Sequence, residues 1–202
     1  MSLQVDYFVA PQSPWTFLGH ERFAAMARAA GATVRVRPMD LARIFPLTGG
    51  LPLPKRAPAR QAYRLVELAR FSKLVGEPLN LHPKFFPVVG DPAARLITAV
   101  REHDGDPAAM RIAGAILRAV WVQERDIADP LTLSALLVEC GLAPGRLDDA
   151  QAPAIQAAYD LDTDAALAAG VFGAPSYVID GELFWGQDRL EFVQRRLAGG
   201  AA

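Results

Sequence analysis

The chain has 202 residues, of which 51% are hydrophobic, enough for one domain of ordinary core size or for a domain that carries an insertion. Its 21 Lys and Arg residues nearly balance its 22 Asp and Glu residues, and the net charge of −1 excludes the basic excess of a typical nucleic-acid-binding protein. The single cysteine, Cys140, excludes an intrachain disulfide and a Cys-X-X-Cys redox pair, and we expect it to be buried near a helix end.

The first forty residues predict a strand, a helix and a second strand. The apolar segment 3–10 reads as a buried strand. Ser13 is in place to cap a helix over about 15–30, because Pro14 suits the first helical position. Residues 32–39 alternate between apolar and basic, so we expect a half-buried second strand, parallel to the first.

The middle of the chain predicts a loop followed by several helices. Residues 40–54 are rich in Gly and Pro and indicate the loop. Apolar residues at helical spacing predict a helix over 59–75, and another over 151–169. Asp-Pro pairs predict that an aspartate caps each of three further helices, at Asp91, Asp106 and Asp129.

The end of the chain returns to strands. Residues 174–180 and 182–186 are predicted to pair as a hairpin through Asp180-Gly181. A terminal helix follows over 187–198, with Asp188 and Glu191 spaced as a capping box.

This order of elements predicts an α/β, thioredoxin-like fold (β-α-β followed by β-β-α) with a large all-helical insertion. Residues 1–40 and 165–202 would form the thioredoxin-like domain, and residues 41–164 the helical insertion domain. The longest apolar runs fall short of the roughly 20 residues that span a bilayer. We therefore expect a cytoplasmic protein that binds neither membranes nor nucleic acid, and the residues suggest no metal site.

The turn after the first strand is unusual for such a fold. Thioredoxin-like redox proteins carry a Cys-Pro-X-Cys turn there, whereas this chain has Ser13 and Thr16 at the two cysteine positions. A serine at a helix N-terminus can donate a hydrogen bond to a thiolate that another molecule supplies. The alternative is that Ser13 only caps its helix, which is worth about 1 kcal/mol.

Two further segments suggest a peptide-binding track. We expect the Ala174–Pro175 bond to be cis, which would expose the backbone of Ala174 for strand-like pairing; an ordinary proline at a strand start is the alternative. Gln187 and Asp188 open the last helix, whose N-terminus suits a carboxylate while Asp188 suits an ammonium group. The alternative for Asp188 is a simple helix cap.

Several motifs together resemble the 2-hydroxychromene-2-carboxylate isomerases, which are related to the kappa-class glutathione transferases and to DsbA-type proteins. The motifs are DYFVAPQSPWTFLG at 6–19, RPMDLARIF at 37–45 and GVFGAPSYVIDGELFWGQDRL at 170–190, with a weaker match at 63–79. They touch most of the chain, and the last is the most specific.

The resemblance implies that glutathione is the cofactor. Ser13 matches the serine that hydrogen-bonds the glutathione sulfur. Ala174, before Pro175, matches the backbone that pairs with the cysteinyl unit, and Gln187 and Asp188 match the positions that hold the γ-glutamyl end.

The substrate side is less well defined by the sequence. Arg60 stands where relatives often have Lys and would reach a carboxylate of glutathione or of the substrate, with a solvated helix face as the alternative. Trp15 and Lys84 are further candidates for substrate contacts, although a surface-loop role is the alternative for Lys84. Relatives often carry an Asn-Ser pair in the loop at 85–91, where residues 88–90 here read Val-Val-Gly.

The function that the resemblance implies is a glutathione-dependent isomerase, acting on 2-hydroxychromene-2-carboxylate or a related intermediate of aromatic catabolism. The cis–trans change would pass through a transient glutathione adduct. The partners would be a small aromatic substrate, glutathione and a second copy in a homodimer. The alternatives are a kappa-like glutathione transferase or peroxidase, and a redox-inactive module that binds thiol peptides.

Overall fold

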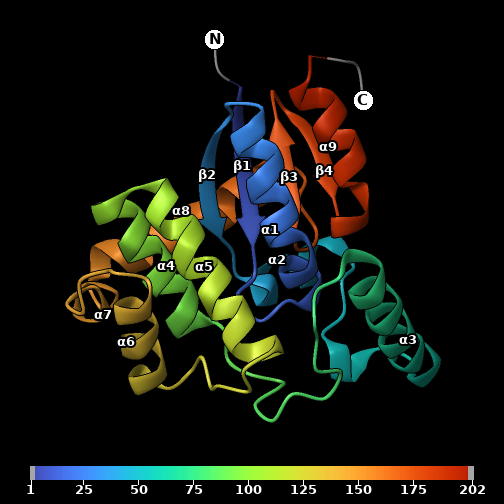
Figure 1. The fold of residues 1–202 in the computed structure, drawn as a ribbon, viewed down its shortest axis with the longest axis horizontal. Coiled ribbons are helices and arrows are strands. Elements are labelled where there is room, and N and C mark those ends of the chain that lie inside the picture. Colours follow the sequence, from blue (N-terminus) through green and yellow to red (C-terminus); the bar gives the residue numbers. More distant parts are fainter. Residues whose placement is uncertain (1–2, 200–202) are drawn as a thin grey trace.

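The computed structural model describes residues 3–199, in which four strands form one mixed sheet of order β2-β1-β3-β4 (Figure 1). The central strand β1 (Gln4–Val9) pairs in parallel with β2 (Thr33–Pro38) and antiparallel with β3 (Ser176–Ile179). The edge strand β4 (Glu182–Trp185) pairs antiparallel with β3. The first and last parts of the chain therefore build the sheet together.

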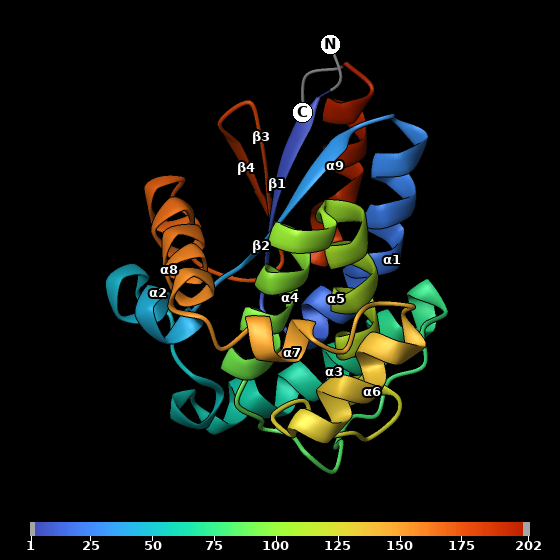
Figure 2. The same ribbon diagram turned by 90° about the vertical axis from the view of Figure 1, so that its left-hand side faces the viewer.

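Helices cover both faces of this sheet. On one face lie α1 (Pro14–Ala29) and α9 (Leu190–Leu197), and on the other lie α2 (Leu41–Thr48) and α8 (Pro153–Ala168) (Figure 2). The side chains of β1 alternate between the two hydrophobic cores, as the pleat of a strand requires.

The remaining helices come from the middle of the chain. They are the 3-10 helix η1 (Leu53–Lys55), α3 (Pro58–Val75), α4 (Asp91–Asp104), α5 (Asp106–Trp121), α6 (Pro130–Glu139) and α7 (Arg146–Asp149). In Figure 1, α4 to α7 lie on one side of α1 and α3 lies on the other. The predicted thioredoxin-like fold with a large helical insertion is confirmed.

Several local predictions are confirmed. Asp129 caps α6 by accepting a hydrogen bond from the backbone N–H of Leu131. Gly76 ends α3 in the left-handed conformation. Asp180 and Gly181 connect β3 to β4 with positive φ angles of 48° and 81°, the conformation that a two-residue type I′ turn requires.

Five local predictions are wrong. The expected loop at 40–54 contains α2, because the Asp40 side chain caps that helix despite an internal proline. The N-caps of α4 and α5 are Gly90 and Gly105, so the aspartates that follow these glycines lie inside the first turn. The terminal capping box does not form, since Arg189 occupies the N-cap of α9 without a side-chain bond. Cys140 is half-buried rather than buried.

Among residues 3–199, no helix is both long enough and apolar enough to cross a bilayer.

A buried ion-pair cluster joins the helical middle of the chain to the sheet. Asp162 of α8 lies between Arg101 of α4 and Arg37 of β2, and its carboxylate contacts both guanidinium groups. Arg37 also pairs with Asp6 of β1 at 2.8 Å, and Arg101 donates to the backbone carbonyl of Val36. The Asp162 side chain is only 2% exposed, and its loss would leave Arg37 with Asp6 alone and Arg101 with Glu102 alone.

We therefore predict that Asp162→Asn lowers the free energy of unfolding by about 1–3 kcal/mol, measured by urea denaturation, because each arginine keeps one other carboxylate. The matched control is Asp160→Asn, on the same helix. Asp160 is 48% exposed and pairs with Arg43 at 3.3 Å, so its neutralisation should cost less than about 1 kcal/mol. Equal losses in the two variants would contradict a structural role for the cluster.

Candidate functional site

Ser13 lies where β1 turns into α1. Its backbone N–H donates to the carbonyl of Ala10 at 2.9 Å, and its Oγ caps α1 by accepting from the N–H of Thr16 at 3.2 Å. The Ser13 O–H points to the carbonyl of Ala174 at 3.5 Å, well beyond the usual O–H···O distance of about 2.7–2.8 Å. The hydroxyl hydrogen is thus held only weakly and can turn toward another acceptor.

The N-terminus of α1 presents its positive end without local compensation. The first turn of this 16-residue helix contains no acidic side chain. Burial lowers the pKa of His20, in α1, and raises the pKa values of Tyr7 and Tyr177 in the strands beneath it, so these groups are neutral at pH 7. Those neutral groups therefore do not weaken the attraction between the α1 dipole and an anion next to Ser13.

The loop before β3 lies opposite Ser13. The Ala174–Pro175 bond is cis, as predicted. The Pro175 carbonyl accepts from the N–H of Gly186 at 2.9 Å, and the Ser176 hydroxyl donates to the carbonyl of Gly173 at 2.8 Å. These bonds hold the half-buried Ala174 beside the N-terminus of α1.

Gln187 and Asp188 lie in the short 3-10 helix η2 (Gln187–Arg189), which packs against α1. The Gln187 side chain points inward, and its Oε1 accepts from Arg22 of α1 at 3.1 Å. The Asp188 carboxylate is 41% exposed and pairs with neighbouring Arg189 at 2.8 Å. The structure thus presents the carboxylate at the surface but uses the glutamine side chain to attach η2 to α1.

The predicted substrate residues are more widely distributed. Trp15, in the first turn of α1, packs edge-on against Phe71 of α3 with 6.0 Å between ring centroids. Arg60 is exposed on α3. Lys84 is exposed in the loop before α4, with its Nζ 5.0 Å from the centroid of the Phe85 ring. Of these three residues, Trp15 lies in the first turn of the helix that Ser13 caps.

Sequence reasoning missed the packing of Trp185 against Gly173 in this region. Trp185 is paired with Ser176 in the β3–β4 register, and its half-exposed indole packs on Phe172 with 4.7 Å between centroids. A Cβ built on Gly173 would lie 2.5 Å from Trp185 Nε1, so the indole fills the space that this glycine leaves. The sequence signal that could have indicated this packing is Gly173 directly before Ala174-Pro175, together with the aromatic Trp185 on the other strand of the predicted hairpin.

Comparison with known proteins identifies the family and the fold of the chain. A family model described as a DSBA-like thioredoxin domain matches residues 4–198. A 2-hydroxychromene-2-carboxylate isomerase of Pseudomonas putida is 29% identical over 194 residues, which cover 94% of this chain and 92% of that protein. The predicted resemblance to these isomerases is confirmed.

Solved structures give the same result. A 2-hydroxychromene-2-carboxylate isomerase has a TM-score of 0.81 at 25% identity, with 97% of this chain and 95% of that chain covered. The cytosolic disulfide reductase DsbM from Pseudomonas aeruginosa, solved with GSH, has a TM-score of 0.69 at 20% identity and covers 96% of this chain and 93% of its own. The second likeness concerns the fold.

We predict that Gly173→Ala displaces the Trp185 indole and lowers the free energy of unfolding by about 1–3 kcal/mol. The emission spectrum of tryptophan should change, because Trp185 is half exposed in the parent protein. Gly145→Ala is the control, since a Cβ there meets nothing within 4 Å and the φ angle of −59° suits alanine. An unchanged spectrum and stability in Gly173→Ala would refute the packing described here.

Proposed function

Because the chain belongs to the DSBA-like thioredoxin domain family, we propose that it is a glutathione-dependent isomerase acting on 2-hydroxychromene-2-carboxylate or a related intermediate of aromatic catabolism. The relatives support the isomerase activity. The observation that carries the proposal is the Ser13 hydroxyl, weakly bound at the N-terminus of α1 in a position where redox relatives have a cysteine.

The residues of the site fit glutathione. When bound, glutathione supplies a thiolate that adds reversibly to a double bond of the substrate and so permits rotation about that bond. Ser13 Oγ would donate its hydrogen to the sulfur, because its present acceptor is 3.5 Å away. The α1 dipole would further stabilise negative charge at that point.

The rest of the tripeptide would lie along the loop before β3. The backbone of Ala174 would pair with the cysteinyl unit, next to cis-Pro175. The Asp188 carboxylate would bind the γ-glutamyl ammonium group. This contact would replace its exposed ion pair with Arg189. Gln187 would serve this end indirectly, because its amide attaches η2 to Arg22.

One observation favours a second candidate, a kappa-like glutathione transferase or peroxidase. The Gln12 side chain lies against Gly90, since a Cβ on that glycine would overlap its Oε1. The loop at 85–91 therefore borders the opening turn, and its residues 88–90 are Val-Val-Gly where the resemblance leads us to expect an Asn-Ser pair. Turnover of hydroxychromene carboxylate, compared with that of chlorodinitrobenzene, separates the isomerase from the transferase. A module that only binds thiol peptides would turn over neither compound.

The homodimer and the cytoplasmic location stay predictions.

We predict that Ser13→Ala lowers kcat by about tenfold to a hundredfold while glutathione affinity changes little, because the lost bond acts mainly on the thiolate. The pKa of the bound thiol should rise by about one to two units, since the hydrogen bond favours the charged form. The rate–pH profile then moves to higher pH.

Both variant and parent should be prepared with Cys140→Ser, so that the thiolate absorbance comes from glutathione alone. Asp129→Ala is the control, because it removes a comparable N-cap from α6, remote in sequence from the turn. Unchanged turnover and an unchanged thiol pKa in Ser13→Ala would refute the proposed role.

We also predict that Asp188→Asn weakens glutathione binding about tenfold in calorimetric titration, because it removes a charged acceptor for the γ-glutamyl ammonium group. Binding of N-acetylcysteinylglycine, which has no ammonium group, should not change. Glu191→Gln, an exposed neutralisation in the first turn of α9, is the control for general charge effects. Equal weakening of both ligands would contradict this placement.

A further inference from the structure

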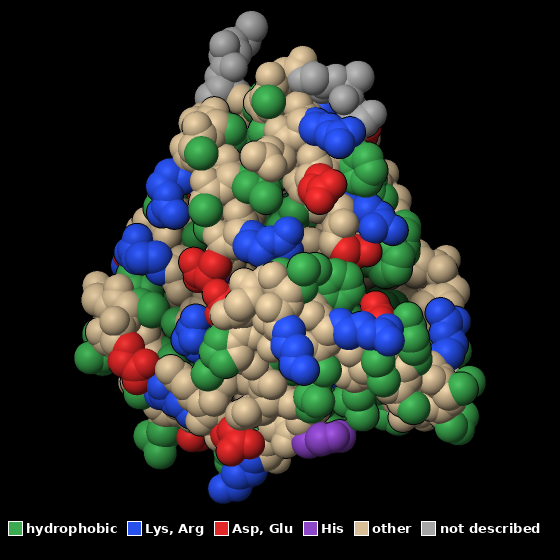
Figure 3. Space-filling view, turned by 45° about the vertical axis from the view of Figure 1, so that its right-hand side comes forward, with side chains coloured by type: hydrophobic (Ala, Val, Ile, Leu, Met, Phe, Trp, Pro, Cys, Tyr) green, Lys and Arg blue, Asp and Glu red, His purple; other side chains and the backbone are tan. Residues whose placement is uncertain are grey.

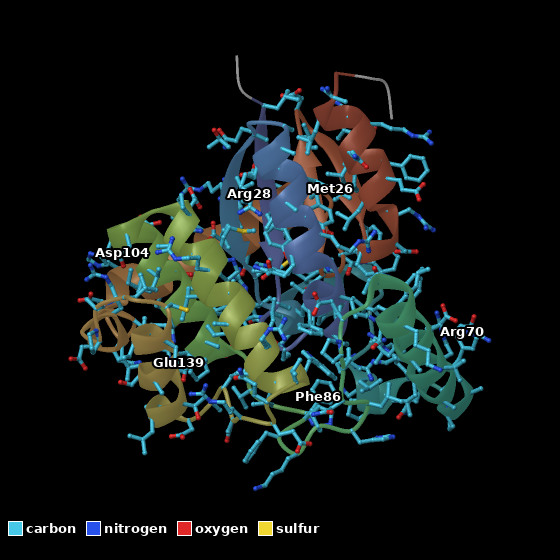
Figure 4. The ribbon with its side chains drawn as sticks, viewed as in Figure 1. Met26, Arg28, Arg70, Phe86, Asp104 and Glu139 are labelled. Atoms are coloured by element: carbon cyan, nitrogen blue, oxygen red, sulfur yellow. The ribbon has the colours of Figure 1, made fainter. Side chains whose placement is uncertain are left out.

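Arg64 lies on the inner face of α3 without an acidic partner. It precedes Phe71 by seven residues, about two helical turns, so the two side chains share the face that reaches Trp15. Its guanidinium carbon is 5.4 Å from the ring centroid of Phe86 and 5.9 Å from that of Trp121. In Figure 4, Phe86 lies in the loop beside α3. Among residues 3–199, no carboxylate forms an ion pair with Arg64.

Two more arginines add to the positive charge around Arg64. Burial and the charge of Arg60 lower the pKa of Arg56, and burial together with Arg56 lowers the pKa of Arg64 to about 10. In the described part of the chain neither Arg56 nor Arg60 forms an ion pair. By contrast, Arg70 pairs with Glu67 at 2.7 Å and points outward from α3 (Figure 4). The cations near Arg64 thus repel one another and lack an anion.

A cavity of about 350 Å³ opens beside Arg64, between α3, η1 and the loop that leads to α4. Its walls are mostly apolar, with Leu53, Leu65, Leu81 and Phe86 among them, and His82 adds a polar group. Figure 3 brings this side of the molecule forward, and basic and hydrophobic side chains lie next to one another over its lower half. A cation at the edge of an apolar cavity suits a ligand with an aromatic body and an acidic end.

We propose that this cavity binds the aromatic acid substrate and that Arg64 pairs with its carboxylate. Arg56 and Arg60 strengthen the attraction, and the Phe86 and Trp121 rings keep the planar guanidinium oriented. The identification of this ligand as the substrate rests on the proposed function.

The test is a calorimetric titration without glutathione, with 2-hydroxycinnamate as the acid probe and its neutral amide as the comparison. The parent protein should bind the acid about tenfold to a hundredfold more tightly than the amide. Arg64→Met should remove this preference, because methionine keeps the apolar contacts but not the charge. Arg70→Met is the matched control and should retain the preference, since Arg70 lies outside the cavity and already has a partner.

Arg64→Gln provides a second neutral variant if Arg64→Met does not fold. We expect it to lose the preference for the acid over the amide as well. The proposal is refuted by a parent protein that does not prefer the acid, or by a folded Arg64 variant that still does. A separate titration of Arg64→Met with glutathione should match the parent. If glutathione binds neither protein while the acid preference follows Arg64, the proposed function fails and the carboxylate site stands.

Discussion

The antiparallel pairing of β1 with β3 is the constraint on which the site depends. In this register Phe8 faces Ser176, so the end of β1 and the start of β3 lie side by side although they are far apart in the chain. The turn that follows β1 and the loop that precedes β3 then meet at one edge of the sheet. Ser13 and Ala174, separated by 161 positions, contact each other for this reason. A shift of one residue in this pairing would turn the side chains of β3 to the opposite face of the sheet.

The helical middle of the chain supplies the other side of the same region. Trp15 contacts Phe71 of α3, and Gln12 contacts Gly90 in the loop before α4. The residues proposed to bind the thiol, Ser13 and Ala174, thus come from the first and last parts of the chain, which form the sheet. The residues that surround them, such as Phe71 and Gly90, come from the helical middle of the chain.

The parts of the fold that sequence could predict are those decided by local chemistry. The Asp180-Gly181 turn requires positive φ angles that these residues tolerate, and Ser13 caps a helix that begins with proline. Where the same residues are compatible with either a loop or a helix, the prediction from sequence was wrong. Pro46 suggested a loop although Asp40 starts a helix there.

Features that depend on distant partners could not be predicted. Gln187 points inward because Arg22 of α1 donates to its amide, and no local pattern indicates that partner. Arg64 resembles any solvated helical arginine in the sequence. Its position becomes clear only when the rings of Phe86 and Trp121, from two other segments, are found beneath it.

The most direct test of the central claim is a crystal structure of the protein grown with glutathione. The account predicts that the sulfur lies within hydrogen-bonding distance of Ser13 Oγ, with the cysteinyl backbone paired to Ala174. It also predicts that the γ-glutamyl ammonium group contacts Asp188. Glutathione bound elsewhere, or a sulfur directed away from Ser13, would contradict the account.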